Sequence, residues 1–132
     1  HASTQMGLHN SAGLEFAAQH DIKRVILERQ ATLVELERMM KKCPPGVETE
    51  MFIHGALCCC ISGTCLLSSW LGGWSGNRGK CKQLCRLPYS FYNKNSLIKK
   101  GYLLSAKDFN LINRLQDLEN AGIPMYFVPY DK

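Results

Sequence analysis

The stretch Arg24 to His54, RVILERQATLVELERMMKKCPPGVETEMFIH, predicts a strand, a helix and a second strand in succession. The apolar run 24–27 is typical of a short buried strand. Thr32 can cap a helix that continues to Lys42, in which apolar residues recur at helical spacing, namely Leu33, Leu36, Met39 and Met40. The Pro-Pro-Gly of 44–46 ends this helix, and residues 48–54 form the next strand. A strand-helix-strand unit with short connections favours a parallel sheet, so this stretch predicts an α/β fold.

The flanking segments extend the same alternation. Upstream, we expect an extended start over 1–6 and a helix over 12–19, capped by Asn10 and Ser11. Downstream, we expect a short strand over 102–105, a helix over 108–120 and a strand over 125–128. These elements divide the chain into three parts: strand-helix units over 1–55, a cysteine-rich basic insertion over 56–101, and a strand-helix-strand continuation over 102–132.

The composition describes an ordinary globular domain. The chain has 132 residues, 16 Lys and Arg against 11 Asp and Glu, and 45% apolar residues, which excludes disordered and collagen-like classes. The longest mostly apolar run, 55–67, is shorter than the roughly 20 residues of a membrane helix. The chain begins at His1 and shows no export signal, so we expect a cytoplasmic piece of a longer protein with no membrane partner.

Charge is unevenly distributed along the chain. Residues 51–107 contain no Asp or Glu but eight Lys and Arg, together with the aromatic residues Trp70, Trp74, Tyr89, Phe91, Tyr92 and Tyr102. Basic residues interleaved with aromatic rings suit RNA, because phosphates supply the attraction and ring faces stack on bases. The alternative is a solvated loop around a small local core.

Seven cysteines is a high number for this length. An odd number without an export signal argues against a disulfide framework and favours metal or cluster ligation. Glycine-rich turns allow four of the thiolates to converge on one centre, namely those of Cys58, Cys65, Cys81 and Cys85. Their spacing favours an iron-sulfur cluster, with zinc as the alternative metal. Burial as small hydrophobic side chains is the alternative that best suits Cys43, Cys59 and Cys60.

His54 is a candidate catalytic residue. It is the last residue of the strand expected over 48–54 and precedes the cysteines, which is where barrel enzymes place catalytic groups. The alternative is a hydrogen-bonded histidine that orients the loop. Glu50 is a candidate ion-pair partner for Arg78 or Lys107.

Three strings are characteristic of a known family: EMFIHGALC from Glu50 to Cys58, SGTCLLS from Ser62 to Ser68, and the Asn-Arg-Gly, Cys, Gln, Cys-Arg and Tyr pattern of 77–89. The chain resembles peptidase family U32, the collagenase-like proteases, over most of its length. The resemblance implies a TIM-type (β/α) barrel. This chain would be a partial barrel with a cysteine-rich insertion, completed by the missing segments of its parent chain, and its open sheet edges would favour a homo-oligomer.

The resemblance implies two activities. One is that of an iron-sulfur-dependent hydroxylase of tRNA or rRNA, with a 4Fe-4S cluster on the cysteines and prephenate as cosubstrate. The other is that of a collagenase-like peptidase, although the sequence has no Gly-x-Ser-x-Gly or His-Glu-x-x-His motif. A third hypothesis is that the chain is a non-catalytic, metal-stabilised RNA-binding fragment.

The resemblance assigns the cluster ligands position by position, and the other expected site residues include those chosen from the sequence pattern above. Cys58, Cys65 and Cys81 match cluster ligands of the family, whereas Asn110 stands where many members have the fourth cysteine, and Cys85 is the nearest substitute. The family's Arg-Glu pair is Arg29-Gln30 here. The expected catalytic residues are His54, Arg29 and Glu50. The expected substrate or RNA contacts are Gln5, Arg78, Lys80, Lys82, Arg86 and Trp74.

Overall fold

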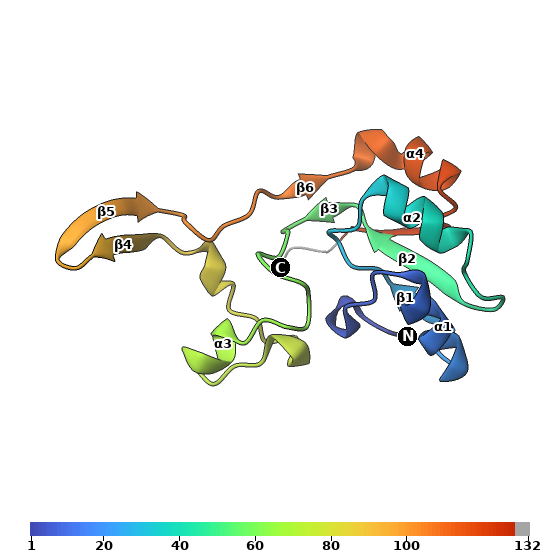
Figure 1. Ribbon diagram of the computed structural model, residues 1–132, viewed down its shortest axis with the longest axis horizontal. Coiled ribbons are helices and arrows are strands. Elements are labelled where there is room, and N and C mark those ends of the chain that lie inside the picture. The colour runs from blue at the N-terminus through green and yellow to red at the C-terminus, as the bar shows by residue number, and fades with distance from the viewer. Residues whose placement is uncertain (129–132) are drawn as a thin grey trace.

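The core of the protein is a small parallel sheet. The structure is a computed structural model that describes residues 1–128. The strands β1 (Arg24–Ile26), β2 (Glu48–Phe52) and β7 (Met125–Phe127) pair in parallel in the order β1-β2-β7 (Figure 1). Outside β1, Ala2 forms a parallel bridge to Val25. The predicted parallel sheet is therefore confirmed.

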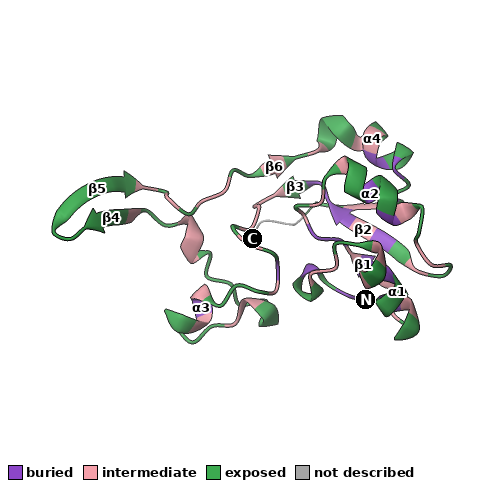
Figure 2. Cartoon of the chain, in the orientation of Figure 1, coloured by how far each residue is buried: buried purple, intermediate pink, exposed green. Residues whose placement is uncertain are grey.

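Helices cover one face of this sheet: α1 (Ser11–Gln19), α2 (Leu33–Met40) and α4 (Leu115–Asn120). Their inner side chains pack with alternate residues of the strands. This core consists of Ala2, Leu14, Ala17, Val25, Leu27, Leu36, Met39, Met51, Ile53, Leu118 and Ile123. Figure 2 shows that the buried residues gather in this part of the molecule. Burial of these side chains is the main stabilising contribution, because it removes apolar surface from water.

Both predicted N-caps are present. The Asn10 side chain accepts a hydrogen bond from the Gly13 N–H at the start of α1. Thr32 begins α2 with a capping box, in which its hydroxyl accepts from the Glu35 N–H and the Glu35 carboxylate accepts from the Thr32 N–H. Hydrogen bonds from the Thr32 side chain and backbone lower the pKa of Glu35. The local sequence therefore predicts where α1 and α2 begin.

Within residues 1–128, no helix covers the other face of the sheet. It presents the Arg24–Glu48 ion pair (2.8 Å) and the edge-to-face rings of Phe52 and Phe127 (4.9 Å between centroids), with Glu50 between them in register. Parallel sheets are normally covered on both faces. This face would line the interior of the predicted barrel, which stays a prediction because the described strands form no closed barrel.

A long excursion leaves the sheet after β2 and returns before α4. It starts at β3 (His54–Gly55), which pairs antiparallel with β6 (Phe109–Asn110). Between them lie α3 (Leu67–Trp70), the 3-10 turns η2 (Gly76–Arg78) and η3 (Leu84–Arg86), and the hairpin β4 (Tyr89–Asn93)–β5 (Ser96–Gly101). Figure 1 shows this hairpin projecting away from the sheet and its helices. The two remaining 3-10 turns are η1 (Thr4–Met6) and η4 (Ile112–Arg114).

Two predicted elements are wrong. Residues 102–105 form a turn and no strand, because β5 already ends at Gly101. The strand β5 pairs with β4 in a hairpin that the sequence did not predict. The predicted helix over 108–120 begins later, at η4 and α4, because Phe109 and Asn110 pair with β3 and Asp108 binds Arg86.

Two predicted extended segments also differ from the structure. The strand expected over 48–54 is split after Phe52, because β3 changes partner from the parallel sheet to β6. The extended start gives way to the 3-10 turn η1 at Thr4. Residues 129–132 of the predicted C-terminal segment lie outside the described residues. No helix in the described part of the chain is long and apolar enough to cross a membrane.

Candidate functional site

A cavity of about 260 Å³ opens beside the loop that follows β3. Its walls come from η1, from the residues after β1, and from the segments that contain η2 and η3. The thiols of six cysteines line it: Cys58, Cys59, Cys60, Cys65, Cys81 and Cys85. Cys43 lies elsewhere, against the core, where its thiol donates to the Val47 carbonyl (3.4 Å). The structure thus brings the four predicted ligands to one cavity and adds Cys59 and Cys60.

Some of the thiols are neighbours across different segments: Cys59 lies near Cys85, and Cys60 lies near Cys65. Burial, with Cys85 and Cys65 nearby, raises the pKa of Cys59. Burial, again with Cys65 nearby, raises the pKa of Cys60 to about 11. Cys58 accepts a hydrogen bond from the Ser62 hydroxyl (3.7 Å). Within residues 1–128, no three His, Cys, Asp or Glu side chains already stand in an arrangement that holds a metal ion. Cysteines therefore line the cavity, but within residues 1–128 their thiols are not already arranged around a metal position.

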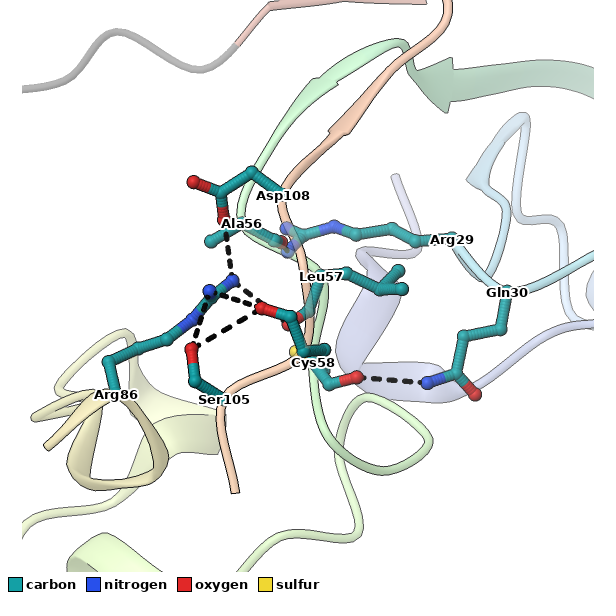
Figure 3. A network of polar contacts seen from close by, with 9 residues as sticks. Arg29, Gln30, Ala56, Leu57, Cys58, Arg86, Ser105 and Asp108 are labelled. Carbon is teal, nitrogen blue, oxygen red and sulfur yellow. Dashed lines mark hydrogen bonds and ion pairs between the residues drawn. The ribbon is translucent and has the colours of Figure 1, made fainter. Parts of the chain in front are cut away.

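Three consecutive residues after β1 hold the cysteine loop. The buried Glu28 carboxyl group, 2% exposed, accepts from the Ser62 N–H (3.2 Å) and the Ser62 hydroxyl (3.3 Å). Arg29 donates to the Ala56 carbonyl (2.9 Å), and Gln30 donates to the Cys58 carbonyl (3.0 Å) (Figure 3). Because all three side chains leave the end of one core strand, the first part of the loop is fixed to the sheet.

Arg29 also lies against an aromatic ring. Its guanidinium carbon is 4.1 Å from the centroid of the Phe52 ring on the open face of the sheet. Its Nε is buried and has no hydrogen-bond partner within residues 1–128. Arg29 lines the cavity beside the cysteines. The structure therefore places Arg29 in the wall of the cavity, and its catalytic role stays a prediction.

Arg86 ties three segments together on the other side of the cavity. Its guanidinium group donates to the carbonyls of Leu57 and Ala106 and to the Ser105 hydroxyl, and it forms an ion pair with Asp108 (2.7 Å) (Figure 3). The predicted RNA contact Arg86 is thus engaged inside the protein.

Gly63 permits the closest backbone approach in the site. Its φ is +87°, and a Cβ placed there would lie 2.0 Å from the Gln5 carbonyl oxygen. Only glycine combines this left-handed backbone with so little space. The loop therefore packs directly on η1 and places Gln5, a predicted substrate contact, in the wall of the cavity.

The other predicted residues lie away from the cavity. His54 is exposed in β3 opposite Asn110, and Glu50 is half-buried on the open face of the sheet. No ion pair in the described part of the chain joins Glu50 to Arg78 or Lys107.

The basic residues near Trp74 have two different environments. Lys82 and Lys80 place their ammonium groups 4.0 and 5.5 Å from the centroid of the Trp74 ring. Arg78 is exposed at the end of η2. Trp74 and its two lysines therefore already interact with one another in this structure.

Sequence reasoning missed the residues that fix the loop, chiefly Glu28 and Ser62. The signal available was an acidic residue directly after the apolar run 24–27, where a buried carboxyl group requires donors. The donor, Ser62, lies 34 positions further along the chain, so local pattern could not identify it.

The sequence that forms this cysteine-lined cavity matches a known protein family. The sequence profile of Peptidase family U32 matches residues 1–127, nearly the whole chain. The chain belongs to peptidase family U32. No solved structure matches it significantly.

Relatives within family U32 carry both kinds of name that the resemblance implied. The chain is 39% identical over 127 residues to an uncharacterized protease of Methanocaldococcus jannaschii, covering 89% of this chain and 31% of the relative. It is 34% identical over 131 residues to tRNA hydroxylation protein P1 of Bacillus subtilis, covering 93% and 31%. It is 33% identical over 140 residues to a collagenase of Porphyromonas gingivalis, covering 96% and 33%. The chain thus spans about a third of the length of these relatives.

Proposed function

We propose that this member of family U32 is the cysteine-bearing part of an RNA hydroxylase with an iron-sulfur cluster in its cavity. The observation that carries the proposal is the convergence of six thiols on one cavity. Thiolates are the ligands that iron-sulfur clusters and zinc select in proteins. The fold holds this loop from two sides, through residues 28–30 and through Arg86.

The donor set fits a cluster in number and in chemistry. Cys58, Cys65, Cys81 and Cys85 would hold it as four thiolate ligands. Cys59 and Cys60 lie close to Cys85 and Cys65, so each could replace a neighbouring ligand. When bound, such a cluster supplies one-electron redox chemistry.

Arg29 is the residue proposed to bind an anion in this cavity. It lines the cavity and is a cation without an acidic partner in the described part of the chain. A planar guanidinium group suits a carboxylate. Prephenate, a dicarboxylate, is therefore a cosubstrate compatible with Arg29.

RNA is the proposed macromolecular substrate, with tRNA or rRNA as the class. The acid-free basic segment 51–107 supports this, because phosphate contacts dominate nucleic-acid affinity. The name of the B. subtilis relative, a tRNA hydroxylation protein, supports it independently.

A collagenase-like peptidase is the second candidate, favoured by the names of the M. jannaschii and P. gingivalis relatives. The described geometry supports it less well. His54, the expected acid-base residue, does not line the cavity.

Metal analysis of anaerobically purified protein tests the proposal. We expect a brown protein with about four iron and four acid-labile sulfide per chain. Replacing Cys58, Cys65 or Cys81 by Ser should lower the iron content sharply, whereas the control Cys43→Ser should retain it. One tightly bound zinc without sulfide would contradict the cluster.

Two further assays separate the remaining functions. Hydroxylated nucleosides should appear by mass spectrometry when cluster-loaded protein acts on RNA with prephenate. Digestion of denatured collagen by the cluster-free protein would favour the peptidase. Metal and RNA binding with neither product would favour the non-catalytic, metal-stabilised RNA-binding fragment.

A further inference from the structure

The hairpin β4–β5 is the most exposed regular element of the protein. Every residue from Ser90 to Lys100 is exposed, including the rings of Phe91 (57%) and Tyr92 (55%). Figures 1 and 2 show it extending away from the sheet with its surface open to solvent. A two-stranded hairpin is marginally stable by itself in water, so we expect this one to gain stability from a partner.

The register of the hairpin gives each of its faces an aromatic ring and a lysine. Phe91 lies directly opposite Lys99. On the other face, Ser90 lies opposite Lys100, and Tyr92 lies opposite Leu97 after a register shift between Phe91 and Tyr92. Lys94 occupies the turn, with a left-handed φ of +51°. The hairpin contains no acidic residue.

These lysines differ from Lys80, Lys82 and Arg86, whose charged groups are engaged within the protein. No ion pair or ring contact within residues 1–128 engages Lys94, Lys99 or Lys100. In contrast, Lys80 and Lys82 lie over the Trp74 ring, and Arg86 pairs with Asp108. Exposed rings and unengaged cations therefore lie together on the hairpin.

We propose that the hairpin β4–β5 is an arm that binds single-stranded RNA, with Phe91 and Tyr92 stacking on unpaired bases and Lys94, Lys99 and Lys100 binding phosphates. This inference rests on the proposed function, because RNA is the partner proposed there. Charge complementarity favours RNA over a protein partner. Protein interfaces deplete lysine at their cores, whereas single-strand binding surfaces combine cations with stacking rings.

Fluorescence anisotropy with a fluorescein-labelled, single-stranded RNA of 20 nucleotides tests the arm. Phe91→Ala should weaken binding by about 5-fold or more, because the stacking of one base is lost. The matched control Phe16→Ala, an exposed ring on α1, should leave the affinity unchanged. Phe91→Leu keeps apolar volume but removes the ring, so it should weaken binding nearly as much as Phe91→Ala. Circular dichroism of each variant verifies that the sheet and helices are intact.

Salt dependence tests the lysines separately. The double variant Lys99→Ala, Lys100→Ala should reduce the slope of log affinity against log salt by about 1.4, at about 0.7 for each phosphate contact with a single strand. The control Lys41→Ala, Lys42→Ala makes the same charge change on exposed residues after α2 and should leave the slope unchanged. Ultraviolet cross-linking should place the RNA on the peptide 89–101.

Three results would overturn the inference. They are undetectable binding at low salt, full affinity in Phe91→Leu, and a double lysine variant that behaves like its control. A dimer that dissociates in Phe91→Ala would instead assign the hairpin to a second copy of the chain. The cluster and the RNA-binding arm fail on different measurements. A protein that lacks iron and sulfide but still binds RNA through the hairpin would refute the cluster and support the arm.

Discussion

Replacing Glu28 by Leu should loosen the cysteine loop, because Glu28 supplies both acceptors for Ser62. Leu has a similar volume but no acceptor, so it leaves the buried Ser62 N–H without a partner. An orphaned buried donor costs about 1–3 kcal/mol. The Ser62 hydroxyl loses less, since it can still donate to the Cys58 thiol. We therefore expect a loss of about 2 kcal/mol in the free energy of unfolding.

Glu28→Gln provides the decisive comparison. Gln retains one oxygen, which can accept from the Ser62 N–H, while the rotatable Ser62 hydroxyl can accept from the new amide. Its loss should stay within about 1 kcal/mol. Glu15→Leu, an exposed position on α1, should change stability by less than about 0.5 kcal/mol.

Urea unfolding measures the stability of these variants, and hydrogen exchange of the Ser62 amide reports on the loop itself. In Glu28→Leu this amide should exchange about 30-fold faster, which corresponds to about 2 kcal/mol. Unchanged exchange at Ser62, or a Gln variant as unstable as the Leu variant, would refute the role assigned to Glu28.

Four further predictions follow from particular contacts. Gly63→Ala should lower the free energy of unfolding, measured in urea, by at least about 2 kcal/mol, because its Cβ would lie 2.0 Å from the Gln5 carbonyl oxygen. The control Gly46→Ala has a similar φ of +82° but no atom within 4 Å of the new Cβ, so it should lower the free energy of unfolding by less. Gln30→Glu should weaken the loop by about 1 kcal/mol, since it turns a donor toward the Cys58 carbonyl into an acceptor, and faster hydrogen exchange over 58–62 measures this. Thr32→Ala should raise the pKa of Glu35 toward its ordinary value in an NMR titration. Because the pKa of Glu35 is lowered in the folded protein, its stabilising effect is present above the unfolded pKa of about 4.3 and disappears as the pH falls through the folded pKa. The difference in Tm between Thr32→Ala and the unsubstituted protein should therefore become smaller in acid. Light scattering at high concentration should show a homo-oligomer, because β7 and the hairpin leave unpaired strand edges, and a stable monomer would contradict this.

The sequence alone determined the elements whose causes are local. The caps Asn10 and Thr32 fix the starts of α1 and α2, since each side chain bonds a backbone N–H three residues away. The spacing of apolar residues in the stretch 24–54 indicates which face each element buries. The strand-helix-strand order with short connections predicts the parallel pairing of β1 and β2. The family strings and the clustered cysteines likewise identify family U32 and its cysteine loop.

Tertiary contacts decided the remainder, because their partners are far apart in sequence. Asp108 starts no helix since Arg86, 22 positions earlier, binds its carboxylate. The strand after Phe52 changes partner because β6 returns beside it at the end of the excursion. Glu28 supports the cysteine loop only because Ser62 arrives 34 positions later. Such pairings form when the chain closes long loops around a packed core, so no local pattern of residues encodes them.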